Sequence, residues 1–218
     1  MLRLIVVVSF ALAVLSGTAV PSHAGEATDV LLAKLAAADP DLRTYRADVA
    51  FDVGLRTFPY LRKTLHGNAY FKRPARMEIV FNDLPPIARA FRNLYVGLGT
   101  PGDWATKFTI TSAAERIDGR DVGYLVLTPR VADRRLREVD VYVDEVVALP
   151  GRIVWRYTDG RVEMRQRFGR VDGHDLVVAQ NADIRLPAVH AYVNAQITNY
   201  AVNVAVDDAV FTPKKPSP

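Results

Sequence analysis

The chain has 218 residues, of which 50% are hydrophobic and none is cysteine, and its formal net charge at pH 7 is +4. Without cysteine there is no disulfide framework, and a structural zinc site loses its most common ligands. The positive charge is small and spread along the chain, which argues against a nucleic-acid-binding protein.

The first 24 residues are predicted to be a secretory signal peptide. Arg3 supplies the positive start, Leu4 to Leu15 form an almost wholly apolar run, and residues 22–24, Ser-His-Ala, offer a signal-peptidase site. The apolar run is too short to span a membrane as a helix. We therefore expect an exported, soluble protein of the periplasm.

An amphipathic helix is expected over Ala27–Ala38. Thr28 or Asp29 can cap its start, and Pro40 ends it. Its apolar stripe is formed by Val30, Leu31 and Leu35, with Leu32 beside them. A helix this short needs another element to pack against.

Strand patterns dominate the rest of a single domain, residues 25–218, in which residues 212–218 are expected to be a disordered tail. The expected strands are Tyr45–Leu55, Leu65–Arg73, Arg76–Phe81, Phe108–Thr111, Ala113–Ile117, Val122–Thr128, Leu136–Asp144, Ile153–Tyr157, Val162–Phe168, Asp175–Leu186 and Val189–Val204, with Val210-Phe211 closing the fold. These ten or eleven strands follow one another closely, so antiparallel pairing in meander order is expected. The fold class is α+β, mainly an antiparallel sheet that curls around something.

One segment interrupts the strands. Pro85-Pro86 fits a helix start, and the apolar residues of Leu84–Tyr95 recur at helical spacing. Gly97–Asp103 is expected to be a flexible loop. This helix is predicted to lie over one face or mouth of the sheet.

The stretch Leu65–Phe81 defines an apolar wall. Side chains alternate along an extended chain, so Leu65, Ala69 and Phe71 share one face that ends at Arg73. On the following strand Met77, Ile79 and Phe81 share a face in the same way. Arg73 therefore lies at the rim of a hydrophobic surface.

The sequence lacks a recognisable catalytic set. The histidines stand in no metal-ligand spacing, and no nucleophile elbow, phosphate-binding loop or dinucleotide fingerprint occurs. The acidic pairs Asp140 with Asp144 and Asp207 with Asp208 are expected to be solvated rather than to act as general acid and base. We therefore expect a binding protein, not an enzyme, with no metal site and no cofactor.

A row of arginines alternates along one strand. Arg161, Arg165 and Arg167 share the polar face of Val162–Phe168 and are expected to stay in water, paired with Glu163 or with carboxylates across the sheet. A docking patch for an acidic partner is the alternative interpretation. Trp155 and Phe168 are expected on the apolar side, where a core position is more common than a binding site.

A local motif gives a resemblance to a known family. The segment Gly67–Pro74 reads Gly-Asn-Ala-Tyr-Phe-Lys-Arg-Pro and follows a signal peptide, a short helix and the first strands. This order and the glycine-to-proline spacing resemble the LolA-like family of periplasmic lipoprotein carriers. Weaker similarities are Val141-Tyr142-Val143-Asp144 and the closing Asn199-Tyr200, Asn203, Asp208 and Phe211.

The resemblance implies an unclosed antiparallel half-barrel with a helical lid over a hydrophobic cavity. It implies that the arginine of the Lys-Arg-Pro segment, Arg73, bonds to the lid. We expect the lid to be either Ile87–Tyr95 or the first helix. The residues expected to line the cavity or the lid are Val49, Phe51, Val53, Ala69, Phe71, Arg73, Met77, Ile79, Phe81, Ile87, Phe91, Leu94, Tyr95, Leu125, Leu127, Val141, Trp155 and Phe168.

The function that this implies is a carrier or chaperone for the acyl chains of a lipoprotein or lipid. Its partners would be those acyl chains and membrane-associated donor and acceptor proteins, and not nucleic acid. After Phe81 the family usually has a hairpin, whereas this chain has Leu84–Asp103, so a carrier or sensor of another lipid fits equally. Two alternatives remain, an envelope-sensing or regulatory module that binds protein through a sheet edge, and a hydrolase whose site is assembled from distant residues.

Overall fold

The computed structural model describes residues 23–57, 60–74, 76–82, 98, 101–131, 135–144 and 146–212. They form two α-helices, α1 (His23–Ala37) and α3 (Pro101–Lys107), a final 3-10 helix η1 (Asp208–Phe211), and ten strands. The strands are β1 (Thr44–Leu55), β2 (Arg62–Lys72), β3 (Arg76–Phe81), β4 (Phe108–Ile117), β5 (Arg120–Pro129), β6 (Leu136–Val143), β7 (Pro150–Tyr157), β8 (Gly160–Val171), β9 (His174–Leu186) and β10 (Val189–Val202).

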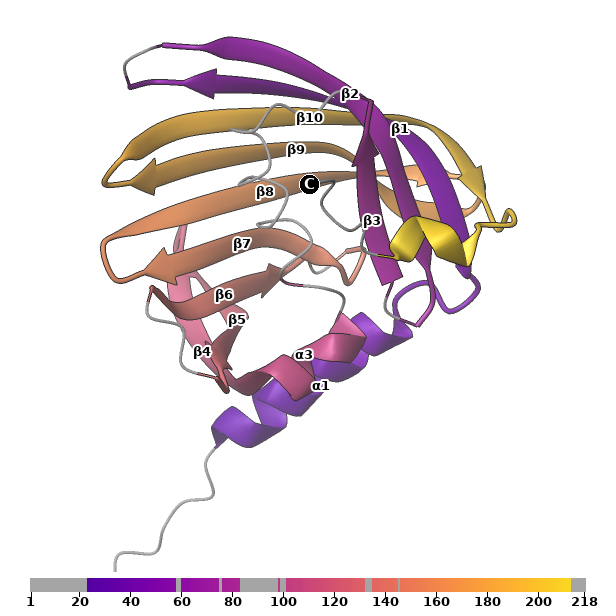
Figure 1. Ribbon diagram of the computed structural model, residues 1–218. Coiled ribbons are helices and arrows are strands. Elements are labelled where there is room, and N and C mark those ends of the chain that lie inside the picture. Colours follow the sequence, from indigo (N-terminus) through magenta and orange to yellow (C-terminus); the bar gives the residue numbers. More distant parts are fainter. Residues whose placement is uncertain are drawn as a thin grey trace, which may run out of the picture.

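All ten strands belong to one sheet in the order β3-β2-β1-β10-β9-β8-β7-β6-β5-β4, and the pairs are antiparallel. The order is that of a meander except that the first strand pairs with the last. β3 and β4 are the two edges and do not pair with each other, so the sheet curves without closing (Figure 1). This confirms the expected unclosed antiparallel sheet.

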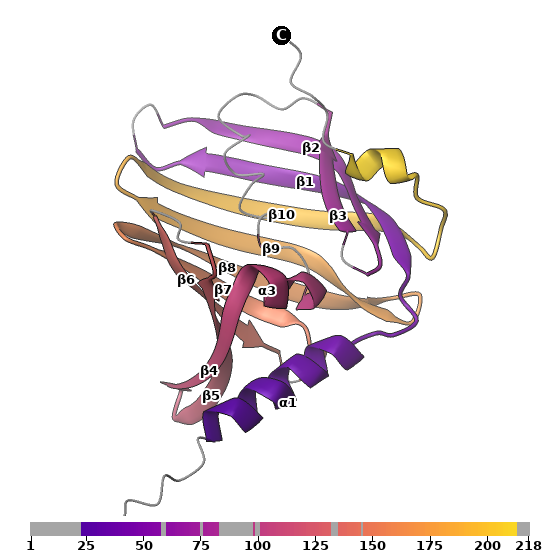
Figure 2. The same cartoon turned by 60° about the horizontal axis from the view of Figure 1, so that its bottom comes forward.

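Both helices lie on the same side of the curved sheet. α1 runs beside β4 and β5 at one end and reaches the start of β1 at the other, and α3 contacts both α1 and β4 (Figure 2). Within the described part of the chain, neither helix has the length and apolarity that crossing a membrane requires.

The two faces of the sheet differ in character because side chains alternate along each strand. We call the face that packs against α1 and α3 the inner face, and the opposite one the outer face. Apolar side chains of the inner face form one core cluster: Val49, Phe51, Val53 and Leu55 of β1, Leu65 and Ala69 of β2, Ile79 and Phe81 of β3, Phe108 and Ile110 of β4, Leu125 and Leu127 of β5, Val139 and Val141 of β6, Ile153 and Trp155 of β7, Val162 and Met164 of β8, Ala182 and Ile184 of β9, and Ala191, Val193, Ala195 and Ile197 of β10.

The helical parts differ from expectation. α1 begins at His23, four residues before the predicted start, so Thr28 is a buried residue inside the helix rather than its cap. Leu35 is buried and Leu31 and Leu32 pack on the core, but Val30 is 50% exposed, so its place in the apolar stripe was wrong.

The segment before β4 also differs. Asp103 lies in α3 rather than in a loop, and Trp104 from this helix is buried in the core. The two strands predicted over residues 108–117 are one strand, β4, and Val210-Phe211 ends the fold as part of η1. The predicted helix Leu84–Tyr95 lies outside the described residues.

Candidate functional site

The inner face is continuous across the sheet, because the register of neighbouring strands aligns its apolar residues. Met164 of β8 lies opposite Ala182 of β9 on one side and Ile153 of β7 on the other. Ile153 in turn lies opposite Val141 of β6. The result is an apolar surface that runs across every strand from β3 to β4.

Most of the predicted lining residues lie on this face. Val49, Phe51, Val53, Ala69, Ile79, Phe81, Leu125, Leu127, Val141 and Trp155 belong to the core cluster or pack against it. Phe71 and Met77 lie opposite each other and in line with Tyr45, and Phe168 lies opposite Val177, so these three share the inner face at its margins. Ile87, Phe91, Leu94 and Tyr95 lie outside the described residues.

Helix α1 covers part of the inner face with few anchors. Among its described side chains, Leu31, Leu32 and Leu35 join the core, and Trp104 and Leu98 reach the same core from the region of α3. The indole Nε1 of Trp104 is buried and has no hydrogen-bond partner among the described residues. The cover of this face is therefore apolar, like the face itself.

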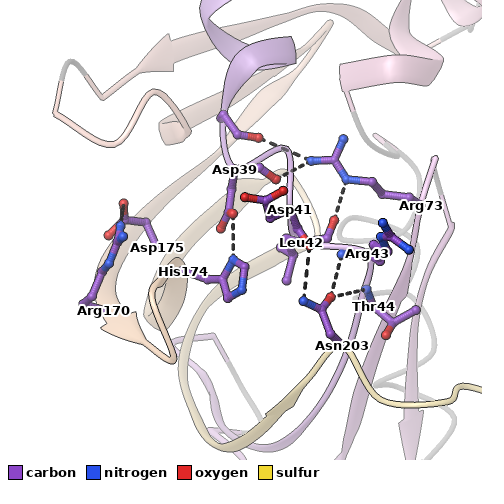
Figure 3. Close-up of polar contacts among 11 residues, drawn as sticks. Asp39, Asp41, Leu42, Arg43, Thr44, Arg73, Arg170, His174, Asp175 and Asn203 are labelled. Carbon is purple, nitrogen blue, oxygen red and sulfur yellow. Dashed lines mark hydrogen bonds and ion pairs between the residues drawn. The ribbon is translucent and has the colours of Figure 1, made fainter.

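Arg73 binds the segment that directly follows α1. Its Nε donates to the carbonyl of Leu42 at 2.5 Å, and its Nη2 donates to the carbonyls of Asp39 at 2.5 Å and Ala38 at 3.4 Å (Figure 3). A cation is favourable at a helix C-terminus, where carbonyls are unpaired and the helix dipole is negative. Arg73 was predicted to contact one of two helices. The described residues show its contact with the C-terminal side of the first helix.

Two further side chains hold the same connection, residues 38–43, and the sequence did not single them out for this role. His174 at the start of β9 hydrogen-bonds through Nδ1 to Oδ1 of Asp39 at 2.6 Å. Asn203, just after β10, accepts from the backbone N–H of Arg43 at 2.8 Å and donates to the carbonyl of Asp41 at 3.2 Å (Figure 3). Three residues therefore hold the end of α1: Arg73 just after β2, His174 at the start of β9, and Asn203 just after β10.

The outer face carries a polar cluster that includes a buried acid. The side chain of Asp140 is 2% exposed and accepts a hydrogen bond from Nε of Arg156 at 2.6 Å. Burial raises the pKa of this carboxyl, and the hydrogen bond from Arg156 opposes that rise. The expectation that Asp140 is solvated was wrong, because large neighbours on the outer face cover it.

Aromatic rings lie near Asp140 on the outer face, and an arginine packs on one of them. Tyr124 stacks on Tyr142 with 4.6 Å between ring centroids, and the guanidinium of Arg152 lies 4.6 Å from the centroid of Tyr142. The hydroxyl of Tyr142 donates to Glu115. Arg152 also pairs with Glu163, so the outer face is a connected polar network over β4 to β8.

Glu163 gives this network a predictable pH dependence. Burial raises its pKa, but hydrogen bonds from Arg165 and the charge of Arg152 outweigh burial, and the pKa lies below the ordinary 4.5. A carboxylate whose pKa is lower in the folded than in the unfolded state stabilises the fold above the unfolded pKa and loses this effect as the pH falls. This pairing also confirms that Arg165 stays exposed beside Glu163.

Replacing Glu163 by glutamine should therefore lower the free energy of unfolding by about 1 kcal/mol at pH 7 and change it little near pH 3. Urea unfolding at several pH values measures both quantities, with exposed Asp121→Asn as the control. A loss of equal size at both pH values would contradict the assignment.

The other acidic pair also has a structural role. Asp207 caps η1 through the backbone N–H of Ala209, and Asp208 pairs with Lys72 at 2.6 Å and with Arg76 at 2.9 Å. The bond from Lys72 is the main reason that the pKa of Asp208 lies below its usual value. Among the described residues, no three or more metal-ligating side chains gather in one place.

The sequence itself matches no protein-family profile and no curated protein. Solved structures do match. A DUF1329 family protein from Desulfovibrio piger has a TM-score of 0.62 at 14% identity, over 87% of this chain and 97% of that one. A putative outer membrane lipoprotein-sorting protein domain from Vibrio parahaemolyticus has a TM-score of 0.57 at 9% identity, over 86% and 95% of the two chains.

A LolA superfamily protein from Nitrosomonas europaea matches with a TM-score of 0.53 at 12% identity, over 85% of this chain and 97% of that one. At such low identities these matches establish a common fold. The resemblance that the Gly67–Pro74 segment indicated is thereby confirmed at the level of the fold.

Proposed function

We propose that this protein is a soluble periplasmic carrier that binds the acyl chains of a lipoprotein or lipid against the inner face of its sheet and transfers them across the envelope. The observation that carries the proposal is the inner face itself, which is apolar from one edge of the sheet to the other. The same fold in a lipoprotein-sorting domain supports a lipoprotein as cargo. Membrane-associated proteins would deliver and receive it.

The energetics of an acyl chain fit such a surface. Each methylene removed from water contributes about 0.8 kcal/mol, so a chain of a dozen methylenes gains roughly 10 kcal/mol when it is fully buried. An apolar layer between the sheet and a helix provides this burial without a charged group. The helix must be able to move for the ligand to enter.

The attachment of α1 suits that movement. Its apolar anchors are few, whereas its C-terminal end is held by the hydrogen bonds of Arg73. Displacing α1 breaks these contacts and leaves the strand pairing intact. The sheet thus acts as the fixed wall and α1 as the movable cover.

Binding of a fluorescent fatty-acid probe to the purified protein tests the proposal. We expect saturable binding that palmitate displaces and butyrate does not, because only the longer chain buries enough apolar surface. Mass spectrometry of the protein isolated from its native envelope should find an acylated molecule bound to it. Absence of probe binding together with absence of bound lipid would refute the proposal.

Arg73→Leu is expected to speed the dissociation of the probe about tenfold, which corresponds to about 1.4 kcal/mol of lost closure. The reason is that the guanidinium binds the carbonyls of Asp39 and Leu42 only when the end of α1 is in place. Stopped-flow displacement measures the rate, and Arg43→Leu, at an exposed position in the same connection, is the control. A large fall in melting temperature with unchanged dissociation would make Arg73 a structural residue.

A further inference from the structure

The inner face contains two neighbouring glutamines. Gln166 of β8 lies directly opposite Gln180 of β9, and Gln180 lies opposite Ala195 of β10. Ala195 in turn lies opposite Phe51 of β1. Because residues that pair across strands point to the same side, both amides belong to the face that Phe51 and Ala195 define.

Their surroundings are apolar. Two residues along, on one side of the glutamines, lie Met164 and Ala182, which pair with each other. On the other side lie Phe168 and Val177, which also pair, after a register shift that makes Val177 the third residue from Gln180. No charged residue belongs to these three rows of paired positions on β8 and β9, so the amides form a neutral polar spot within a hydrophobic surface.

Gln180 differs from the other buried polar residues of the described chain. Three such residues are buried there, Thr28, Asp140 and Gln180, with Gln180 only 7% exposed. Asp140 binds Arg156 and Thr28 has a partner, whereas the side chain of Gln180 forms no hydrogen bond within the described residues. The amide atoms of Gln180 are not among the fully buried unpaired side-chain atoms of the described residues, so they keep some access to solvent. A polar group that has no protein partner and can be reached on an apolar face is free to hydrogen-bond to a ligand there.

We propose that Gln180, with Gln166 beside it, binds the carbonyl of an ester- or amide-linked acyl chain that lies on the inner face. This inference rests on the proposed function and adds to it the chemical class of the ligand. A primary amide both donates and accepts hydrogen bonds and carries no charge. Its N–H therefore matches the neutral carbonyl of an ester or amide, and its oxygen can accept from the N–H of an amide link or from a hydroxyl elsewhere in the lipid. A free carboxylate or phosphate would instead need a cation to offset its desolvation.

Two lipids of equal chain length test the inference, monopalmitoylglycerol, which has an ester carbonyl, and hexadecylglycerol, an ether that lacks it. The native protein should bind the ester about tenfold more tightly, because a site built for a hydrogen bond discriminates against an analogue that lacks the group. Gln180→Leu should reduce this preference to less than about twofold and leave the affinity for the ether unchanged or higher.

Melting temperature separates binding from structure. Gln180→Leu should raise the melting temperature of the ligand-free protein, because it replaces an unpaired amide by an apolar group in an apolar setting. Gln196→Leu is the matched control, since this glutamine of β10 lies exposed on the outer face opposite Ala50 and Ala179. It should leave the ester preference intact.

The possible results distinguish failure of the carbonyl assignment from failure of the carrier function. Equal affinity of the native protein for ester and ether would overturn the carbonyl assignment and leave the carrier function standing. A fall in melting temperature in both Gln180→Leu and Gln180→Met would also overturn it, because the amide would then be a structural group. If neither lipid nor the fatty-acid probe binds, the proposed function fails as well.

Discussion

Replacing Phe71 by aspartate is expected to weaken the binding of an acyl probe at least about thirtyfold, or 2 kcal/mol, while the protein stays folded. Phe71 is half-buried at the margin of the inner face, where its ring stacks on that of Tyr45 with 5.3 Å between centroids. A carboxylate there removes apolar contact area and must lose water when an acyl chain covers it. Fluorescence titration measures the affinity.

The neighbouring residue provides the control. Tyr70 is also half-buried but points to the outer face, opposite Arg46 and Glu78. Tyr70→Asp introduces the same charge on the same strand and should change the affinity by less than about twofold. Equal loss in the two variants would show that the effect is not specific to the inner face.

Phe51 is a less informative site for the same substitution. It is 3% exposed and makes an edge-to-face contact with Phe81, 5.4 Å between centroids. An aspartate buried at this position has no cation to pair with in the core cluster, so we expect it to unfold the protein. Loss of binding in Phe51→Asp would then report on stability.

Arg156→Met is expected to lower the free energy of unfolding by about 3 kcal/mol and the melting temperature by roughly 6–12 °C. The substitution leaves the buried carboxylate of Asp140 without its hydrogen-bonded cation, and a buried unpaired charge is among the costliest defects in a fold. Arg156 itself is 44% exposed, so the expected loss is at the lower end of the range for buried pairs. Urea denaturation and calorimetry measure the two quantities.

Asp140→Asn should change stability by less than about 1 kcal/mol. Burial already raises the pKa of Asp140, so the fold disfavours its charge, and an asparagine oxygen still accepts the hydrogen bond from Arg156. The double variant Asp140→Asn with Arg156→Met should be more stable than Arg156→Met alone, because it has no unpaired buried charge. A double variant less stable than Arg156→Met would contradict the buried-charge explanation.

The sequence predicts the sheet well for a simple reason. An extended chain has a side-chain period of two, so the alternation in β1, β2 and β8 indicates the inner face directly. Phe168 was expected on the apolar side of β8 and lies on the inner face with Val162 and Met164. The sequence predicts the ends of the strands less well. Each strand continues through polar residues, and whether these pair depends on the neighbouring strand.

The missed features depend on contacts between distant parts of the chain. Asp140 falls on the polar side of its strand, as expected, but only contacts across the strands reveal that it is covered, since it lies between Val126 and Val154 and binds Arg156. Helix α3 has seven residues and contains Gly102 and Asp103, a composition typical of loops. Packing of Trp104 against the core stabilises it more than its intrinsic propensity does.

The hydrogen bonds at the end of α1 show the same limit. Arg73 was expected to bind a lid because of its motif, whereas His174 and Asn203 carry no local signal for their contacts. Arg43 and Asn203 are 160 residues apart in the sequence. Only the pairing of β1 with β10 brings such residues together.

That pairing of the first strand with the last has a consequence for how the protein matures. Every other pair of neighbouring strands is consecutive in the chain and can form as soon as both strands are made. β1 has β10 as its second partner, and this pair can form only when β10 is available. Contacts so distant in sequence form slowly, since a long loop must close first. β1 therefore keeps one unpaired edge until β10 is available, a period in which a chaperone has its longest opportunity to bind that edge.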